Sequence, residues 1–469
     1  MSTPLLYCNG INAETGDYLC PPATLGHIAA LARGDSISTE SRVDMEYWLR
    51  QGGRGLRAGD PRVLSQAGWG VIFAQNDEQT SAILAALDEV LALRKSQIGE
   101  DFEHRYQEYV GELGFQPGDT KRRFLSRHGV GAGAADPDKM PYYLLIVGDP
   151  ETIPWEFQYE LDMQYAVGRL WFETVDEYRC YAQKVVAAET SPNVRAKSAA
   201  IFAPEHAEDP PTELSRQYLA APLADRIEKA GKGWTVHRAL GGDATKANLL
   251  KILNGGGPPD LLFTAGHGVF YPTGNLDSQR ALMGALVCQD WPGHGCGRGP
   301  RAGEFLSADD VNGANLGGLV SFHFACYSAG VPAIGDFHIT RMRTAQKSFV
   351  SRLPQRLLQA GALAVIGHVD SGYQCSIEFP GAGKHIEVFE DFIDRLLLRG
   401  HTVGSAMENF GVRYADLSRD LGAELEEEKR GAPADEKLLA DLWIHSRDAR
   451  NYVVLGDPAV RLVPPEGEP

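Results

Sequence analysis

Two segments of the chain each combine one reactive side chain with small neighbours. Residues 264–268 read Thr-Ala-Gly-His-Gly and contain His267, while residues 324–330 read Phe-Ala-Cys-Tyr-Ser-Ala-Gly and contain Cys326. A cysteine thiol has a pKa near ~8.5 and is only partly ionised at neutral pH. An imidazole within reach can take the thiol proton and later protonate a leaving amine. The pair therefore predicts amide hydrolysis, with Cys326 as the nucleophile and His267 as the general acid and base.

The backbone beside these side chains is suited to the same chemistry. We expect the N–H groups of Gly268 and Cys326 to form an oxyanion hole. Small flanking residues let the backbone approach a substrate closely. Each residue alone has an ordinary structural explanation, because a buried cysteine is often a small hydrophobe and a His-Gly pair is often a turn. Their combination at two strand ends favours a functional site.

Each reactive segment follows an apolar run that is typical of a buried strand. Residues 261–264 precede His267, and residues 319–324 lead into Cys326. Open parallel sheets gather functional groups at the carboxyl ends of their strands. We therefore expect both side chains at one edge of a sheet.

Further apolar runs alternate with amphipathic segments along the chain. Strands are expected at residues 68–75, 142–147, 199–203, 234–237, 362–366 and 452–455, and helices at about 76–91, 100–127, 212–230, 244–254, 347–360, 384–399 and 401–428. Near-continuous apolar strands between amphipathic helices predict an α/β fold whose parallel sheet is covered on both faces. Residues 1–65 are rich in turn formers without a clear period, and we expect either an irregular lead-in or a small appended structure.

The chain is expected to divide into two α/β units. The polar stretch 189–197 indicates a boundary between an N-terminal subdomain, 1–195, and a domain that carries the chemistry, 196–469. Residues 142–150 and 451–458 echo each other, because each apolar run ends in Gly-Asp-Pro. This echo leaves two interpretations open: a duplicated, non-catalytic first unit, or common turn chemistry.

Composition argues against several classes of protein. There are 45 Lys and Arg against 62 Asp and Glu, and the net charge of −17 argues against a nucleic-acid partner. No run approaches the ~18 apolar residues of a membrane helix, and no secretory signal is visible. The 7 cysteines lack the spacing of a zinc ribbon or a disulfide framework. We expect a cytoplasmic protein without a membrane partner.

The two reactive segments resemble those of the caspase-like cysteine peptidases, specifically the gingipain and CHAT branches. Residues 452–459 are similar to the end of CHAT domains, and residues 144–150 with 165–170 are similar to the strand before the catalytic subdomain of gingipain-like chains. The resemblance covers about 141–463. It implies a caspase-like (caspase-hemoglobinase) fold and an endopeptidase with a protein or peptide substrate.

The sequence also departs from true caspases. Phe324 stands where caspases carry Gln before the Ala-Cys pair, and Tyr327 follows the cysteine. Cleavage after Asp is therefore not expected.

The resemblance implies further properties of the protein. No metal or organic cofactor is needed for the chemistry, although many relatives require activation by calcium, a protein partner or self-cleavage. The sequence itself does not indicate calcium. CHAT relatives often act in bacterial defence, antiviral defence included, or in programmed death, and cleave protein substrates at few sites.

Four acidic residues are candidates for the substrate pocket. In this fold the loop after the first strand of the catalytic unit shapes the pocket, and here it contains Glu205, Glu208 and Asp209. Carboxylates pair with guanidinium groups, so we predict cleavage after Arg or Lys. The same acids also suit the start of a helix, and both interpretations stay open. Asp370, after the strand 362–366, is the other candidate. The sequence assigns no residue to the role of orienting His267.

Other histidines and one loop carry weaker signals. His323 is expected to be a hydrogen-bonded core residue, and His368 is a strand-end residue that could line the cleft. His294 lacks companion ligands for zinc. The glycine-rich residues 293–303 contain two arginines, and self-cleavage within them is a hypothesis.

Two other functions stay open. An interaction scaffold that keeps the fold without the chemistry predicts that Cys326→Ala leaves every activity intact. Another Cys/His amide hydrolase, such as an amidase, would use the same machinery, and the size of its substrate would distinguish it from a peptidase.

Overall fold

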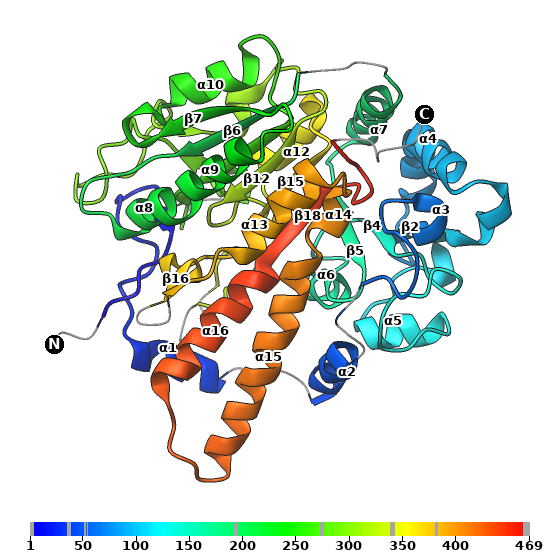
Figure 1. Cartoon of the computed structure of the whole chain (residues 1–469), viewed down its shortest axis with the longest axis horizontal. Coiled ribbons are helices and arrows are strands. Elements are labelled where there is room, and N and C mark those ends of the chain that lie inside the picture. Colours follow the sequence, from blue (N-terminus) through cyan, green and yellow to red (C-terminus); the bar gives the residue numbers. More distant parts are fainter. Residues whose placement is uncertain are drawn as a thin grey trace.

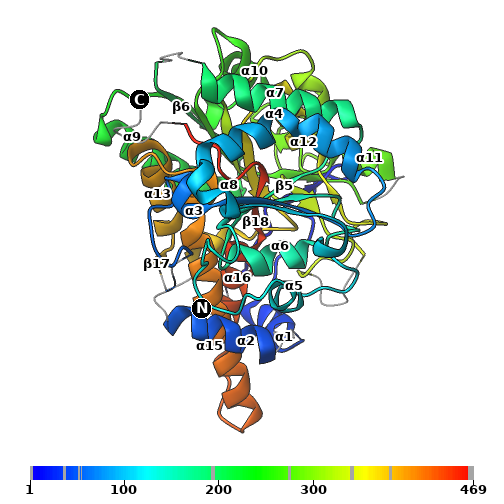
Figure 2. The same ribbon diagram turned by 90° about the vertical axis from the view of Figure 1, so that its right-hand side faces the viewer.

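The computed structural model describes residues 4–34, 39–50, 53, 55–191, 196–272, 276–337, 343–379 and 383–462. One sheet extends across both halves of these residues, with helices on both faces (Figures 1 and 2). Its strand order is β3-β2-β4-β5-β18-β15-β12-β8-β6-β7. The strands are β2 (Trp69–Phe73), β3 (Tyr106–Tyr109), β4 (Tyr143–Val147), β5 (Ala166–Leu170), β6 (Ser198–Ala203), β7 (Thr235–Leu240), β8 (Leu261–Ala265), β12 (Val320–Phe324), β15 (Ala364–His368) and β18 (Tyr452–Gly456).

The central strands are apolar because both of their faces are covered. Every residue of β4, β8, β12 and β15 is buried, which explains their continuous apolar runs. β12 pairs in parallel with both β8 and β15. β18 runs antiparallel to β15, with Tyr452 opposite His368, so the sheet is mostly but not wholly parallel. β18 follows α16 (Glu436–Asn451) without a connecting loop, so it starts at the edge where β15 ends and runs back.

Amphipathic helices pack on the two faces of the sheet. α4 (Thr80–Ile98), α7 (Val175–Thr190) and α12 (Arg352–Ala360) lie on one face, and α5 (Lys121–Arg127) and α6 (Trp155–Asp162) lie on the other (Figure 2). α4 buries Ile83, Leu87, Val90 and Leu91, the apolar positions that the sequence indicates. The predicted helices at 212–230, 244–254 and 384–399 correspond to α8 (Pro210–Leu214) and α9 (Ala221–Ala230), α10 (Lys246–Asn254) and α13 (Glu387–Ile393).

Two regions differ from the sequence-based expectation. The helix predicted over 100–127 is wrong, because a turn, the edge strand β3 and the short helix α5 occupy this region. Gly111 adopts a positive φ of 54°, which ends the local run and returns the chain toward the sheet. α15 (Glu408–Lys429) was expected, but α16 was not, and the two form a hairpin that projects from the sheet (Figure 1).

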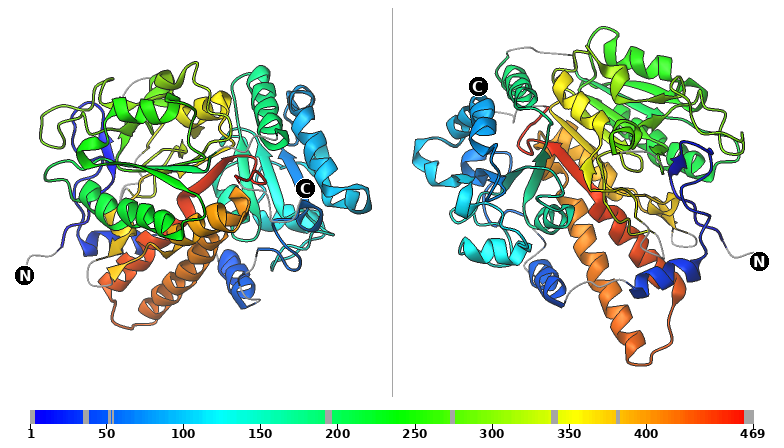
Figure 3. Two further views of the ribbon diagram at one scale, coloured as in Figure 1. Left: turned by 45° about the horizontal axis from the view of Figure 1, so that its top comes forward. Right: turned by 180° about the vertical axis from the view of Figure 1, so that it is seen from behind.

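Of the two alternatives for the first residues of the chain, the structure shows a small appended structure, ordered against the rest of the protein. β1 (Gly10–Asn12) pairs in parallel with β9 (Gly268–Phe270), and β10 (Leu286–Val287) and β11 (Phe305–Leu306) complete this small sheet. α1 (Leu25–Gly34) packs on α16, and α2 (Thr39–Arg50) packs on α15 (Figure 3).

The predicted boundary between two units stays a prediction. Residues 192–195, where it was placed, lie outside the described residues, and the large sheet is continuous across both halves. Among the described helices, none is long and apolar enough to cross a membrane.

Candidate active site

His267 and Cys326 lie at the same edge of the sheet, as the sequence predicts. β8 ends two residues before His267, β12 ends two residues before Cys326, and the two strands are paired in parallel. Each of the two residues is 1% exposed. Adjacent parallel strands thus bring together two residues that are far apart in the sequence.

Asp209 joins this pair from the neighbouring strand. The loop after β6 leads to Asp209, whose carboxylate Oδ2 lies 2.6 Å from His267 Nε2. Thr212 donates to the same oxygen at 2.9 Å, and the Tyr18 hydroxyl donates to Oδ1 at 2.7 Å. Asp209 also begins α8, so it is both a helix-start residue and a direct partner of the histidine.

Both nitrogens of His267 are hydrogen-bond donors in this conformation. Nδ1 lies 2.7 Å from the carbonyl oxygen of Asn9, which can only accept, and Nε2 faces the Asp209 carboxylate. Burial favours a lower pKa for His267, but the charge and hydrogen bond of Asp209 outweigh it and raise the pKa. Burial likewise favours a higher pKa for Asp209, but His267 lowers it below its ordinary value. The two residues therefore form an ion pair.

The Cys326 thiol is enclosed and protonated. Its Sγ accepts a hydrogen bond from the Gly372 N–H at 3.1 Å, and the Cys8 thiol lies against it. Burial and then the Cys8 thiol raise the pKa of Cys326 well above its ordinary range. Because both His267 nitrogens have other partners, the histidine is not placed to take the thiol proton in this state.

The backbone around Cys326 makes a tight turn. Tyr327 has a φ of 58°, an uncommon conformation for a bulky residue, and its N–H donates to the Asp370 carbonyl at 2.9 Å. A Cβ added to Gly268 would lie 1.9 Å from the Cys326 carbonyl oxygen, so only glycine fits there. The two segments predicted to supply the oxyanion hole are therefore in direct contact.

Residues 5–24, which we call the strap, cross this edge of the sheet. The Asn9 N–H donates to the Gly372 carbonyl at 2.9 Å, and the Tyr7 carbonyl accepts from the Gln374 N–H at 3.0 Å. A Cβ added to Gly10 would lie 3.6 Å from Cys326 Cβ. The strap therefore passes over the nucleophile as an extended strand, with the Asn9 carbonyl on the histidine.

The four acidic pocket candidates have different surroundings. Asp209 contacts His267, whereas Glu205 is half-buried in an ion pair with Arg216 and Glu208 is exposed. Asp370 is buried beside Tyr327, and its carboxylate accepts from the backbone N–H groups of Ser371 and Asp336, each at 2.7 Å. Burial and then the charge of Asp336 raise the pKa of Asp370 to about 7.

The remaining sequence signals have clear locations. His323 is a satisfied core residue, as predicted, with Thr264 Oγ1 2.8 Å from Nδ1 and Ser321 Oγ 3.0 Å from Nε2. His368 is buried and lies 3.4 Å from Asp448, and its role at the cleft stays a prediction.

The glycine-rich loop 293–303 packs on the strap. His294 stacks on Tyr18 with ring centroids 4.6 Å apart, and the Gly299 N–H donates to the Glu14 carbonyl at 3.2 Å. Of its two arginines, Arg298 is ion-paired with Glu304. Self-cleavage in this loop stays a prediction.

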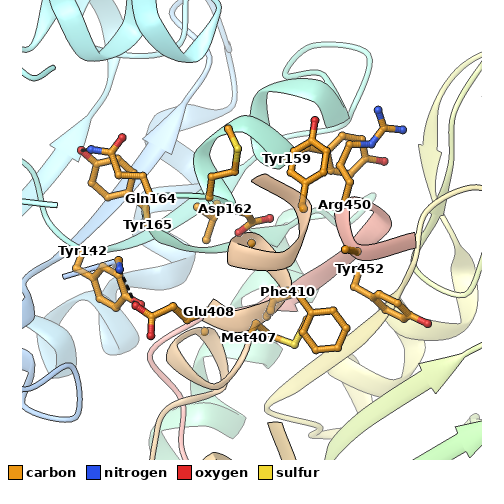
Figure 4. Close-up of a pocket in the computed structure, with 18 residues that line it drawn as sticks. Tyr142, Tyr159, Asp162, Gln164, Tyr165, Met407, Glu408, Phe410, Arg450 and Tyr452 are labelled. Atoms are coloured by element: carbon orange, nitrogen blue, oxygen red, sulfur yellow. Dashed lines mark hydrogen bonds between the residues drawn. The ribbon is translucent and has the colours of Figure 1, made fainter. Parts of the chain in front are cut away.

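A small cavity lies away from Cys326, where α6 and β5 meet α15 and α16 (Figure 4). It contains about 30 Å³, room for about one water molecule. Asp162 is buried in its wall, one of its carboxyl oxygens has no hydrogen-bond partner, and burial raises its pKa well above the ordinary value. Tyr142, Glu408 and Arg450 also line it, but no cysteine does. Its size excludes a peptide substrate.

Comparisons with known proteins place the chain in a family. The model of Peptidase family C25 matches residues 119–463. One similar solved structure is the "Complex of Porphyromonas gingivalis RgpB pro- and mature domains" (TM-score 0.47, 14% identity, 85% of this chain and 80% of that chain covered). Another is described only as "Structure of Protease" (TM-score 0.48, 14% identity, 87% and 80% covered).

A more distant similarity is to the "Saccharomyces cerevisiae separase-securin complex" (TM-score 0.35, 13% identity, 68% of this chain and 16% of that chain covered). No curated protein sequence matches the chain. The sheet and the family match define a caspase-like cysteine peptidase fold. The chain belongs to Peptidase family C25, the gingipain family.

Proposed function

We propose that the protein is a cysteine endopeptidase whose catalytic residues are Cys326, His267 and Asp209. The observation that carries the proposal is the 2.6 Å contact between Asp209 and His267, at the strand end beside Cys326. Asp209 fixes the ring through Nε2, which leaves Nδ1 to exchange protons once Asn9 withdraws.

The reaction then follows from the groups at the site. After the Asn9 carbonyl leaves, His267 releases its Nδ1 proton to solvent and becomes neutral. The neutral ring then takes the Cys326 thiol proton as the sulfur adds to the scissile carbonyl carbon. N–H groups of Gly268 and Cys326 stabilise the oxyanion. The C–N bond breaks as the imidazolium returns the proton to the leaving amine, and water then hydrolyses the thioester to free the acid and the thiol.

The strap supports a peptide chain, rather than a small amide, as the substrate. It is held by backbone groups of Gly372 and Gln374 on one side and by β9 on the other. These groups recognise an extended backbone whatever its side chains. A substrate strand would use the same groups after the strap leaves, so the state described here is latent.

Other properties are proposed on weaker support. Cleavage after Arg or Lys is supported by Glu208, which is exposed on the loop that carries Asp209. A role in bacterial defence or programmed death, activation by calcium or a partner protein, and self-cleavage rest on the family resemblance alone.

The test uses fluorogenic peptides varied at the residue before the scissile bond. The chain carries a cleavage site for an unrelated protease in place of residues 35–38. Cutting there breaks the covalent link between the strap and the rest of the chain. We expect activity to rise on cutting, to disappear in Cys326→Ala, and to persist in Cys296→Ala, which removes an exposed cysteine.

Three results would change the proposal. Equal activity of Cys326→Ala and the unsubstituted chain would exclude the nucleophile and favour the scaffold. Hydrolysis of small amides but of no peptide would favour an amidase. Peptide cleavage after residues other than Arg or Lys would retain the nucleophile and exclude the acidic pocket.

A further inference from the structure

Three potential metal ligands meet on the side of the molecule where α16 packs against the chain that follows β15. They are His385, Asp441 and His445, and among the described residues they form a group whose candidate ligand atoms all lie within 4.8 Å of one another. Asp441 and His445 are four residues apart on α16, so they share one helix face. His385 comes from a separate segment, directly after β17 (Gly383–Lys384).

The three side chains already lie close together. His445 Nδ1 lies 2.7 Å from Asp441 Oδ1, and the two histidine rings have centroids 4.5 Å apart. Nε2 of His385 is buried without a hydrogen-bond partner. An unpaired buried nitrogen costs free energy, which a bound ion would recover.

The backbone holds His385 in this position independently of any ion. Its N–H donates to the Ile377 carbonyl at 2.9 Å, and its carbonyl accepts from the Arg413 guanidinium at 3.0 Å. The charge of Arg413 opposes a cation, and the negative charges of Asp448, Glu387 and Asp441 act against it.

We propose that His385, Asp441 and His445 bind a divalent transition-metal ion of the zinc class. Two imidazole nitrogens and one carboxylate suit such an ion, and water completes a tetrahedral shell. Ligand atoms in that shell are about 3.3 Å apart at the usual bond lengths. Asp441 and His445 therefore separate slightly on binding, and the His445 Nδ1 proton leaves.

The ion acts as a clamp and takes no part in hydrolysis. The segment between β15 and His385 includes Gly372, which contacts Cys326, and Gln374, which contacts the strap. α16, which supplies the other two ligands, packs on α1 directly after the strap. One ion therefore joins the chain beside the nucleophile to the helix that packs on α1. This role does not depend on the proposed peptidase activity.

The test is a Co²⁺ titration of the full chain carrying Cys326→Ala, which removes the reactive thiol as a competing ligand. We expect one bound ion, visible absorption bands of four- or five-coordinate Co²⁺, and no thiolate charge-transfer band. His385→Ala and His445→Ala should each weaken binding at least about 100-fold, since even residues that only support a ligand contribute 10–100-fold. Asp441→Asn should weaken it at least about tenfold.

The matched control is His104→Ala. His104 lies 3.0 Å from Asp138 in an exposed His–Asp pair without a second histidine, so its loss should leave Co²⁺ affinity unchanged. Saturating Zn²⁺ should raise the Tm of the chain and of the control, but not of the ligand variants. If His445→Ala fails to fold, His385→Ala decides alone, since it is half-buried and outside α16. Unchanged Co²⁺ affinity in the ligand variants, or a thiolate band, would overturn the proposal.

Discussion

Two groups of strands in the same sheet end in very different surroundings. β2, β4 and β5 end at an open cleft of about 500 Å³, lined among others by Gln75, Asp149 and Trp171. β8 and β12 end at His267 and Cys326, which the strap covers almost completely. The first edge contains polar and aromatic side chains, but no histidine or cysteine lines its cleft.

The difference shows which part of the site comes from the fold and which from individual residues. Both groups contain buried parallel strands followed by loops, which suffices to make a hollow at the strand ends. Only the second edge places a base, an acid and a thiol on consecutive strands. The open first edge also shows that such an edge does not need a cover, so the strap is specific to the reactive edge.

The two segments that end in Gly-Asp-Pro also show that similar sequences can serve different purposes in the two regions. Asp149 follows β4 and caps an exposed turn by accepting the Glu151 N–H at 2.8 Å. Asp457 follows β18 and is fully buried, where it accepts from Trp69 at 3.0 Å and from Arg94 at 2.7 Å. The same tripeptide therefore serves a surface turn in one place and a buried ion pair in the other.

The largest expected effect separates the acids of the two edges. In the chain with its strap released, Asp209→Asn should lower kcat by about 10³–10⁴-fold, because the amide no longer stabilises the imidazolium. Asp149→Asn at the open edge should leave kcat within about twofold. Steady-state kinetics on one fluorogenic peptide measures both. Equal losses, or none in Asp209→Asn, would remove Asp209 from the mechanism.

The next largest expected effect is on the access of reagents to Cys326, which the strap covers. Ile11 in β1 is fully buried, so Ile11→Asp should detach the strap, because an unpaired buried carboxylate costs several kcal/mol. The rate at which iodoacetamide alkylates Cys326 should rise at least about tenfold, as mass spectrometry of the peptides would show. Val43→Asp, at a position 55% exposed, is the control. Cys296 is exposed in every variant and should react at one rate. An unchanged rate at Cys326 would show that the strap does not control access.

A smaller effect lies beneath the reactive edge, where the core contains a histidine. Burial lowers the pKa of His323 to about 3. Between about pH 6.5 and pH 3, His323 is therefore protonated in the unfolded chain but neutral in the folded protein. Stability from this group is complete above pH 6.5 and falls by about 1.4 kcal/mol per pH unit as the pH decreases toward 3. Urea unfolding at pH 6 and pH 5 should show this slope, and His323→Gln should lack it. The same slope in the variant would assign the pH dependence to other groups.

The smallest effect belongs to the buried carboxyl group of the first half. Burial raises the pKa of Asp162, so above pH 4 the unfolded chain ionises this group more readily than the folded protein, and folding is penalised. Asp162→Asn should therefore raise the Tm at pH 8 by about 1–3 °C. The gain should vanish below pH 4, where the carboxyl is protonated in both states. Calorimetry at the two pH values distinguishes this from a general packing effect, which would persist at low pH.

The sequence predicted the reactive edge well because its signals are local. The apolar runs before His267 and Cys326 mark β8 and β12. Parallel pairing of the two strands then places both residues at the same edge of the sheet. The sequence places Asp209 on the loop after the strand next to β8, but its contact with His267 depends on the direction in which that loop turns. A sequence does not record that direction, although the position of the loop after the adjacent strand was a usable signal.

The strap could not be predicted because its contacts are non-local. β1 is only 3 residues long, too short to show an alternating pattern, and its partners are β9 and the residues after β15. The His385, Asp441 and His445 group was equally hidden, because α16 was not expected and one ligand lies outside it.

The position of the Asn9 carbonyl on His267 has a kinetic consequence. Every substrate or covalent probe competes with the Asn9 carbonyl for His267. Because this carbonyl belongs to the same chain, its effective concentration at His267 does not fall when the protein is diluted. Labelling of Cys326 by a peptide probe should therefore reach a plateau rate as the probe concentration increases. That plateau is the rate at which the chain opens, a property of the protein rather than of the probe. The apparent potency of an inhibitor on the intact chain would thus depend partly on the rate at which the strap opens, and not only on the affinity of the inhibitor for the site.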